Sequence, residues 1–251
     1  MSVYILFGIS AFCLRPVIAH QFPENFLRCN LKDTNLDQCL VRAIENALHI
    51  IGNTGIPSLN LPSIDPIGVS NIQIGADGSS AVNIVQQYKN ISIFGLSDVK
   101  VEKAHYDQHK KILNFTAEHP VLSQEAKYNI TGKVLILSVY GNGDSIITLK
   151  KPRITHVAYF KEYTKGDKRY FRVEDYSATY TIQGAHFVFE NMFNGAEKTL
   201  SGIVSKLINE NWQLIAEEVR GGVQKAYGQL CMATANRIFE TVPIDEIFLG
   251  W

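Results

Sequence analysis

The hydrophobic residues repeat with a helical period near both ends of the chain and with a strand period between them. The first helical stretch follows polar residues 33–35, which are good helix-capping residues, and we expect it to stop at Gly52. Its apolar positions lie three or four residues apart, which predicts an amphipathic helix of about four turns: Leu36, Leu40, Ile44, Leu48 and Ile51.

Segment 55–69 combines three prolines with several large aliphatic side chains. Pro57, Pro62 and Pro66 exclude a regular helix and a central strand. The aliphatic residues are too numerous for a solvated loop. We therefore expect an extended segment laid over a hydrophobic surface, and not a linker between domains.

From residue 69 to about residue 193 the period changes to two, and β-branched and aromatic residues become frequent. The segment 133–140 is typical of these runs, and we interpret it as a single strand. Short turns between neighbouring runs predict an antiparallel meander, and the length of several runs favours one strongly curved sheet. The turns are predicted where glycine, asparagine and aspartate gather: 76–78, 131–132, 141–144, 165–167 and 194–195.

After residue 200 the helical period returns and continues for about 40 residues, or roughly 60 Å of helix. Gly221 and Gly222 are the expected kink or break, and Pro243 follows the end. The apolar residues of this stretch form a continuous stripe along one face of the predicted helix. A stripe this long needs an apolar surface to pack against, so the sheet is expected to wrap the helix. The predicted fold class is α+β: a long C-terminal helix wrapped by a highly curved antiparallel sheet, with a short N-terminal helix. The stripe consists of Val204, Ile208, Trp212, Ile215, Val219, Val223, Ala226, Leu230 and Ile238.

The first residues form an apolar run of signal-peptide length, with small or β-branched residues at Val17 and Ala19. The run is too short to cross a membrane and predicts a secretory signal over residues 1–19, followed by a single domain over 20–251. No lysine or arginine precedes it, which leaves a buried N-terminal strand as the alternative. Three N-glycosylation sequons support export to an extracellular fluid: Asn90, Asn114 and Asn129.

The charge of the chain limits the kinds of partner that it is expected to bind. The 24 basic and 24 acidic side chains give no net charge, and no run of like charges occurs. A nucleic-acid-binding protein would usually show a basic stripe, so we expect no nucleic-acid partner. We also expect no stable membrane insertion and a monomeric protein.

Cys29 and Cys39 lie ten positions apart, which could indicate a metal clamp, a redox pair or a disulfide. In an oxidising compartment the disulfide is favoured. A zinc site would need two more closely spaced ligands, and the chain has no CxxC motif. Cys231 is left as a buried free thiol, with an intermolecular bridge as the alternative.

Enzyme motifs are missing from the sequence, which contains no phosphate-binding Walker loop, no GxSxG and no HExxH. His105, Asp107 and His109 would share one face of a strand and resemble metal ligands. Ligands spaced about 7 Å apart along one strand converge poorly on an ion, so we interpret them as a solvated polar face. We expect no enzymatic activity, no metal and no cofactor.

A long apolar helix facing a curved apolar sheet can enclose a tunnel, although the seam could also be a dry core. The eleven tyrosines would suit such a tunnel, because each offers an apolar ring and a hydroxyl. The aromatic sheet residues expected to face the helix are Phe187 and Phe189, and Tyr140, Tyr159, Tyr176 and Tyr180 are candidates to contact a polar ligand group. From the helix we expect Val204, Leu207, Ile208, Trp212, Ile215 and Val219 to line the tunnel.

An ordered series of motifs resembles the insect Takeout and haemolymph juvenile-hormone-binding proteins. It follows the Cys29 and Cys39 pair and covers the chain from about Arg28 to Leu249: "LVRAIENAL", "GIPSLNLPSIDPI", "VNIVQQYKNISIFGLSD", "FENMFNG", "LINENW" and "VPIDEIF". The resemblance implies the same fold class, secretion, a Cys29–Cys39 disulfide and carriage of a hydrophobic ligand. The hormone carriers proper have a second disulfide, which Cys231 alone cannot form, and this departure favours the Takeout-like branch.

The leading hypothesis is therefore a secreted carrier, in haemolymph or another extracellular fluid, of juvenile hormone, another terpenoid or a fatty acid. The alternative is a lipid-sensing or lipid-transfer protein acting at membranes, against which the absence of a basic patch argues. A hydrolase of the carried ester is a third hypothesis, which the missing nucleophile motif disfavours.

Overall fold

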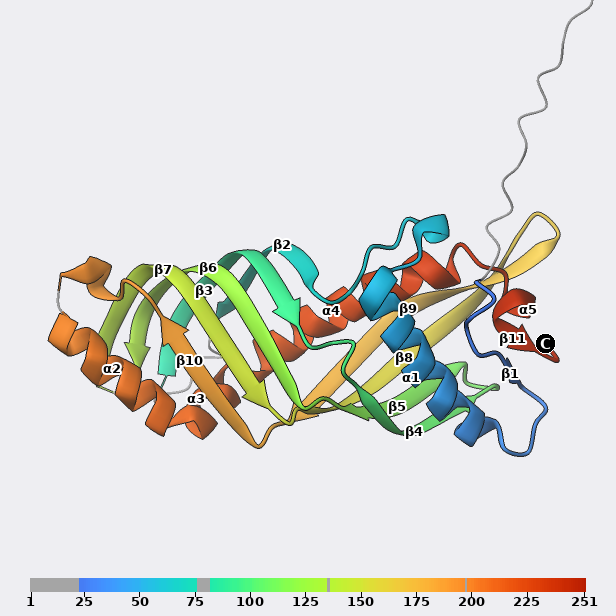
Figure 1. Ribbon diagram of the computed structural model, residues 1–251, viewed down its shortest axis with the longest axis horizontal. Coiled ribbons are helices and arrows are strands. Elements are labelled where there is room, and N and C mark those ends of the chain that lie inside the picture. Colours follow the sequence, from blue (N-terminus) through green and yellow to red (C-terminus); the bar gives the residue numbers. More distant parts are fainter. Residues whose placement is uncertain (1–22, 76–81, 135, 197) are drawn as a thin grey trace, which may run out of the picture.

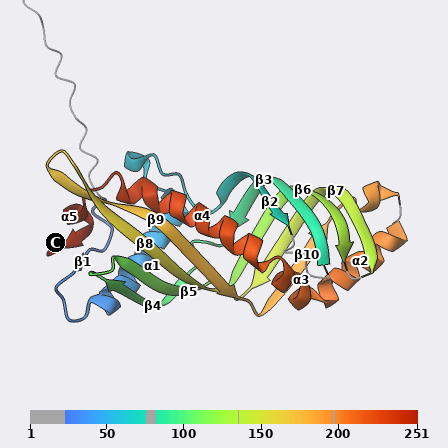
Figure 2. The ribbon, with the colours of Figure 1, turned by 180° about the vertical axis from the view of Figure 1, so that it is seen from behind.

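The computed structural model describes residues 23–75, 82–134, 136–196 and 198–251. The protein is elongated, with one sheet in each half, as Figure 1 and the reverse view in Figure 2 show. The longest C-terminal helix, α4 (Arg220–Phe239), runs from one end to the middle. The expected signal segment 1–19 lies outside the described residues.

The strands of the first half form an antiparallel five-stranded sheet in the order β10-β7-β6-β3-β2. The second half holds an antiparallel four-stranded sheet in the order β4-β5-β8-β9. The first sheet comprises β2 (Ile67–Gly75), β3 (Val82–Phe94), β6 (Val121–Val134), β7 (Leu137–Lys150) and β10 (Gly184–Phe189). The second comprises β4 (Lys100–Asp107), β5 (Ile112–Glu118), β8 (Arg153–Lys165) and β9 (Lys168–Thr181).

Helices cover the concave side of the first sheet and flank the second (Figure 1). Helices α2 and α3 contact β10, α4 lies along β9 and reaches β2, and α1 packs on β4. Near the C-terminus, β1 pairs in parallel with β11. The remaining elements are β1 (Cys29–Asn30), α1 (Leu36–Thr54), η1 (Pro57–Leu59), η2 (Phe193–Gly195), α2 (Lys198–Glu210), α3 (Trp212–Glu218), α4 (Arg220–Phe239), α5 (Ile244–Ile247) and β11 (Phe248–Leu249).

The predicted fold class is confirmed, because long antiparallel strands curve around C-terminal helices. Two details of the prediction were wrong. The strands belong to two hydrogen-bonded sheets where one was expected. The C-terminal helix is interrupted at Asn211 and Val219, and not at Gly221 and Gly222. Gly222 lies inside α4, where a β-carbon would come within 2.9 Å of the Ile74 side chain, so this glycine allows α4 to approach β2 closely.

The predicted turns at 131–132 and 141–144 lie inside β6 and β7. Their glycines allow close contact between backbones instead: a β-carbon on Gly132 would lie 2.1 Å from the Asn83 carbonyl oxygen. The chain reverses within the segment we interpreted as one strand, because Val134 pairs with Leu137. The turn at 165–167 is confirmed between β8 and β9, residues 194–195 lie in η2, and the turn at 76–78 lies outside the described residues.

Helix α1 continues two residues beyond the predicted stop and ends at Thr54. Gly52 sits against Ser97, where a β-carbon would lie 2.2 Å from the Ser97 Cβ. The glycine that ends the helix is Gly55, with φ of 65°. The segment after it lies over a hydrophobic surface, as predicted, with its aliphatic side chains buried against Phe26, Ile51 and Val242.

The Asp65 carboxylate fixes this segment to the loop after β3. Asp65 Oδ1 accepts a hydrogen bond from the Gly95 N–H at 2.8 Å, and Oδ2 accepts one from the Ser97 N–H at 2.9 Å and another from the Ser97 hydroxyl. Burial of the carboxyl raises its pKa, but the hydrogen bonds from Ser97 and Gly95 outweigh burial. The pKa of Asp65 is therefore below its usual value of 3.8.

We expect Asp65→Asn to lower the free energy of unfolding by about 1–3 kcal/mol at pH 7, because an amide cannot accept all three hydrogen bonds. A depressed pKa stabilises the fold above the pKa of the unfolded carboxyl and loses that effect as pH falls through the folded value. The difference between the variant and the wild type should therefore shrink below about pH 4. Urea unfolding between pH 7 and pH 3 measures it, with the exposed Asp167→Asn as control. A difference that stays constant over this range would contradict the assignment.

Candidate functional site

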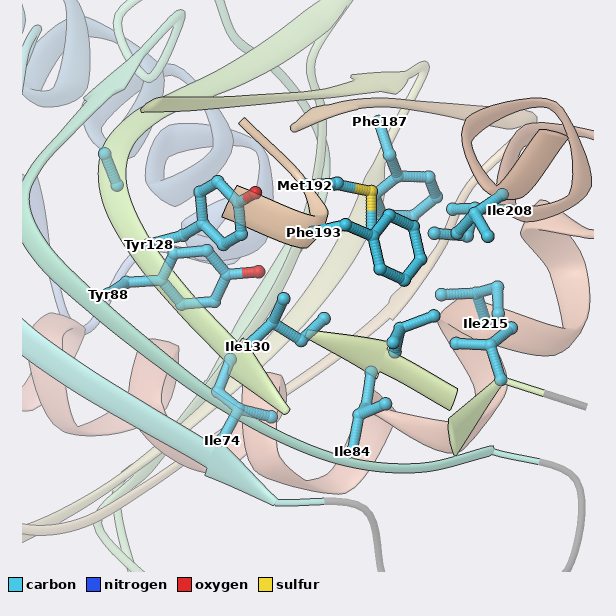
Figure 3. Packing of buried hydrophobic residues seen from close by; sticks show 14 of the residues in the cluster. Ile74, Ile84, Tyr88, Tyr128, Ile130, Phe187, Met192, Phe193, Ile208 and Ile215 are labelled. Atoms are coloured by element: carbon cyan, nitrogen blue, oxygen red, sulfur yellow. The ribbon is translucent and has the colours of Figure 1, made fainter. Parts of the chain in front are cut away.

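An apolar cavity of about 170 Å³ lies between the first sheet and helices α2, α3 and α4. Figure 3 shows part of its wall, where Ile208 and Ile215 approach the inner face of the sheet at Phe187 and Ile84. Isoleucine, leucine and valine make up most of the lining, and no charged residue lines it among the residues that the structure describes. Cavities of this kind hold small apolar molecules.

The alternation of each strand builds the sheet side of the cavity. On β3, Ile84, Gln86 and Tyr88 are buried and line the cavity, whereas the residues between them are exposed. The same alternation on β10 brings Phe187 and Phe189 to the wall, with nearly parallel rings 6.5 Å apart.

Asn209 joins α2 to β10 at this wall. Its Oδ1 accepts a hydrogen bond from the Phe187 N–H at 2.8 Å, and its Nδ2 donates to the Phe187 carbonyl oxygen at 2.9 Å. These two hydrogen bonds pair both backbone polar groups of Phe187 on the edge strand β10. They also fix the distance between α2 and the sheet. The position of Ile208, the next residue on α2, is thereby fixed over the cavity.

Of the six helical residues predicted to line the tunnel, Ile208, Ile215 and Val219 do so. Val204 is instead fully buried in the packed core, and Trp212 packs against that core. Leu207 is half-buried and outside the cavity. The stripe was predicted for a continuous helix, and the interruption at Asn211 changes which side chains face the gap. The lining continues from α4 with Val223, Ala226, Tyr227 and Leu230.

Among the four tyrosine candidates, only Tyr180 lines the cavity. Its ring lies under the Arg220 guanidinium, 5.3 Å from the ring centre. Tyr140 is 45% exposed and stands edge-on to Phe193, outside the cavity. Tyr159 is also exposed. Gln86, Tyr88 and Tyr227 also line the cavity and were not predicted from the sequence. Gln86 and Tyr88 alternate with exposed residues in "IVQQY", which indicates that they share one face of the strand.

Tyr176 does not line the cavity and belongs to a polar cluster with His156, Cys231 and the cavity-lining Tyr227. Its hydroxyl forms a hydrogen bond of 2.9 Å with His156 Nδ1. Burial lowers the pKa of His156 to about 3, so the imidazole is neutral near pH 7. Burial raises the pKa of the free Cys231 to about 12, and hydrogen bonds with Tyr227 and Tyr176 only partly offset it. The cluster thus presents neither an imidazolium nor a thiolate.

The remaining predicted sites lie apart from the cavity. The Cys29–Cys39 disulfide is confirmed, with the Cα atoms 5.8 Å apart. His105 Nδ1 lies 3.0 Å from the Asp37 carboxylate, and Asp107 accepts hydrogen bonds from the turn that follows β4. Within the described part of the chain, no three histidine, cysteine or acidic residues are grouped so as to hold a metal ion. Nor is any described helix both long and apolar enough to span a bilayer.

The fold and cavity define a shell of curved strands and helices around an apolar space. This chain belongs to the haemolymph juvenile hormone binding protein (JHBP) family, which its sequence matches over residues 5–249. It is 25% identical to the circadian clock-controlled protein daywake of Drosophila melanogaster over an alignment of 234 residues, and the match covers 90% of this chain and 88% of that protein. The daywake protein of Drosophila yakuba is 24% identical over the same shares.

Among solved structures, Takeout 1 of Epiphyas postvittana is similar to this protein, with a TM-score of 0.79. The two chains are 23% identical, and the match covers 89% of this chain and 99% of that one. This likeness shows the fold.

Proposed function

We propose that this protein is a secreted carrier of one small hydrophobic molecule, namely juvenile hormone, another terpenoid or a fatty acid. The observation that carries the proposal is the uncharged, apolar cavity enclosed between the first sheet and the C-terminal helices. Membership of a family named for binding juvenile hormone supports it. No residue set for covalent chemistry lines the cavity among the described residues, so we assign binding and not turnover.

Burial of apolar surface would provide the affinity. Removing about 400 Å² of a fifteen-carbon chain from water gains about 10 kcal/mol at 25 cal/mol per Å². Part of this gain is lost when the ligand is immobilised. We therefore expect dissociation constants of about a micromolar or lower.

Delipidated protein should take up an apolar fluorescent probe such as N-phenyl-1-naphthylamine, and a terpenoid or a fatty ester should displace it. Titration of probe fluorescence measures both steps. Circular dichroism confirms that delipidation has left the protein folded. If folded wild-type protein takes up no probe, the space is a dry core and the carrier proposal fails.

Export is the second part of the proposal. Asn90, Asn114 and Asn129 are all exposed, and the residue that follows each of them is buried, so each asparagine side chain is accessible to a glycan. We expect protein secreted by insect cells to lose apparent mass on treatment with an N-glycosidase. Substituting each asparagine with glutamine should remove the same loss step by step. A secreted protein with no mass change would contradict glycosylation at all three positions.

A further inference from the structure

A glutamine is buried in the otherwise apolar wall of the cavity. Six polar side chains line the cavity among the described residues, and only Gln86 and Tyr88 of these are buried, with 7% and 2% of their surfaces exposed. Both lie on β3, two residues apart and on the same face of the strand. Placing an amide among isoleucines is unfavourable unless its polar atoms have partners.

Tyr88 accounts for one of the two polar atoms of that amide. The Tyr88 hydroxyl donates a hydrogen bond to Gln86 Oε1. Burial, with a smaller effect from Tyr128, raises the pKa of Tyr88 well above its usual range, so the hydroxyl remains a donor. Because Oε1 is occupied as an acceptor, the amide orientation is fixed and Nε2 carries the two remaining donors.

Gln86 Nε2 has no hydrogen-bond partner among the residues that the structure describes, and the side chain lines the cavity. A ligand that fills the cavity with hydrocarbon alone would leave both N–H groups without a hydrogen-bond partner and out of contact with water. A ligand with an acceptor oxygen at this depth would pair with one of them. The wall would therefore favour a ligand with an acceptor oxygen over a hydrocarbon of similar size.

Charge restricts the acceptor further. No lysine, arginine or histidine lines the cavity within the described ranges. A carboxylate placed beside Gln86 would be desolvated without an opposite charge, which is far less favourable than burying a neutral carbonyl.

We propose that Gln86, oriented by Tyr88, is the specificity-determining residue of the cavity, and that it selects apolar ligands bearing one uncharged acceptor oxygen, such as an ester, ketone or ether. Gln86 Nε2 donates to that oxygen, and Tyr88 acts as a positioning residue. The inference rests on the proposed carrier function and narrows its ligand class, because ionised fatty acids should bind less well than their esters.

The test compares methyl laurate with tridecane, a hydrocarbon of similar length, by displacement of N-phenyl-1-naphthylamine. The ratio of the two dissociation constants is compared between variants, so differences in water solubility and in overall stability cancel. Gln86→Met keeps the length of the side chain and removes both donors. We expect this substitution to weaken the binding of methyl laurate relative to that of tridecane by about three- to tenfold, the amount that one hydrogen bond contributes.

Tyr88→Phe should shift the ratio in the same direction, because it frees the amide to turn. Gln87→Met, on the exposed face of the same strand, is the matched control and should leave the ratio unchanged. An unchanged ratio in folded Gln86→Met would overturn the proposal. If that variant does not fold, an unchanged ratio in Tyr88→Phe overturns it instead.

Laurate, ionised at pH 8, tests the charge argument. We expect it to bind wild-type protein at least tenfold more weakly than methyl laurate. Equal or tighter binding of laurate would contradict selection for an uncharged ligand. In each of these failures the protein would still bind the probe and tridecane, so the carrier function would stand while the role of Gln86 would not.

Discussion

Replacing Ala226 with tryptophan is expected to lower the affinity for apolar ligands by roughly 70-fold while leaving the protein folded. Ala226 lies on α4 and lines the cavity between Val223 and Leu230, which are also in its wall. An indole at this position would occupy space that the ligand needs. If it removes about 100 Å² of ligand contact, the loss is about 2.5 kcal/mol.

The matched control is Ala233→Trp, which places the same side chain on the exposed face of the same helix. It should bind the probe as the wild type does. Thermal unfolding of both variants distinguishes a blocked cavity from a destabilised fold, because an indole that fills existing space should not lower the melting temperature greatly. If Ala226→Trp melts like the wild type and still binds the probe normally, the ligand does not occupy this cavity.

The order of elements could be predicted from the sequence because each rests on a local period. Helix α1 and the long strands follow from the spacing of apolar residues, which depends only on which face of an element is buried. The segment after α1 follows instead from its three prolines and its many aliphatic side chains. The glycines could not be interpreted in this way. Gly132 and Gly143 lie in strands, where a β-carbon would meet the backbone at Asn83 and Glu190. Contacts between residues distant in sequence decide such positions.

Only three of the six helical residues proposed for the cavity wall line it, for a similar reason. The stripe correctly indicates which residues avoid water, and Val204, Ile208 and Ile215 are all buried. It cannot indicate which of them meet another side chain and which meet a gap. Val204 packs in the core near Phe193, whereas Ile208 and Ile215 face the cavity.

Polar contacts in the wall were the least predictable part. Four tyrosines were proposed by chemistry alone, and only Tyr180 reaches the cavity. Strand register decides this: Tyr159 faces outward on β8, while the neighbouring Ala158 is buried. Counting alternation along "IVQQYK" would have placed Gln86 and Tyr88 together on the inner face. The pairing of their polar atoms still required the structure.

Removing the disulfide with Cys29→Ser and Cys39→Ser together is expected to lower the melting temperature by about 6–12 °C. Closing a loop of about ten residues contributes about 3 kcal/mol in the chain-entropy model. For a protein of this length, 1 kcal/mol corresponds to about 2–4 °C. The bridge ties β1 to α1, and β1 in turn pairs with β11 through Cys29 and Phe248.

In addition to this global effect, local opening should become easier at the C-terminal end of the molecule. The Leu31 N–H donates to the Leu249 carbonyl oxygen at 2.9 Å, and the Arg28 guanidinium donates to the Asp245 carbonyl oxygen at 2.6 Å. Hydrogen exchange should speed up in β1, α5 and β11 and change little in β6 and β7, which are distant from the bridge. Probe affinity should be nearly unchanged, because no described residue of β1, α1, α5 or β11 lines the cavity. Cys231→Ser is the control and should leave the exchange of β11 unaltered. If exchange rises uniformly along the chain, the bridge does not act through the β1–β11 pair, and its contribution lies in the unfolded state alone.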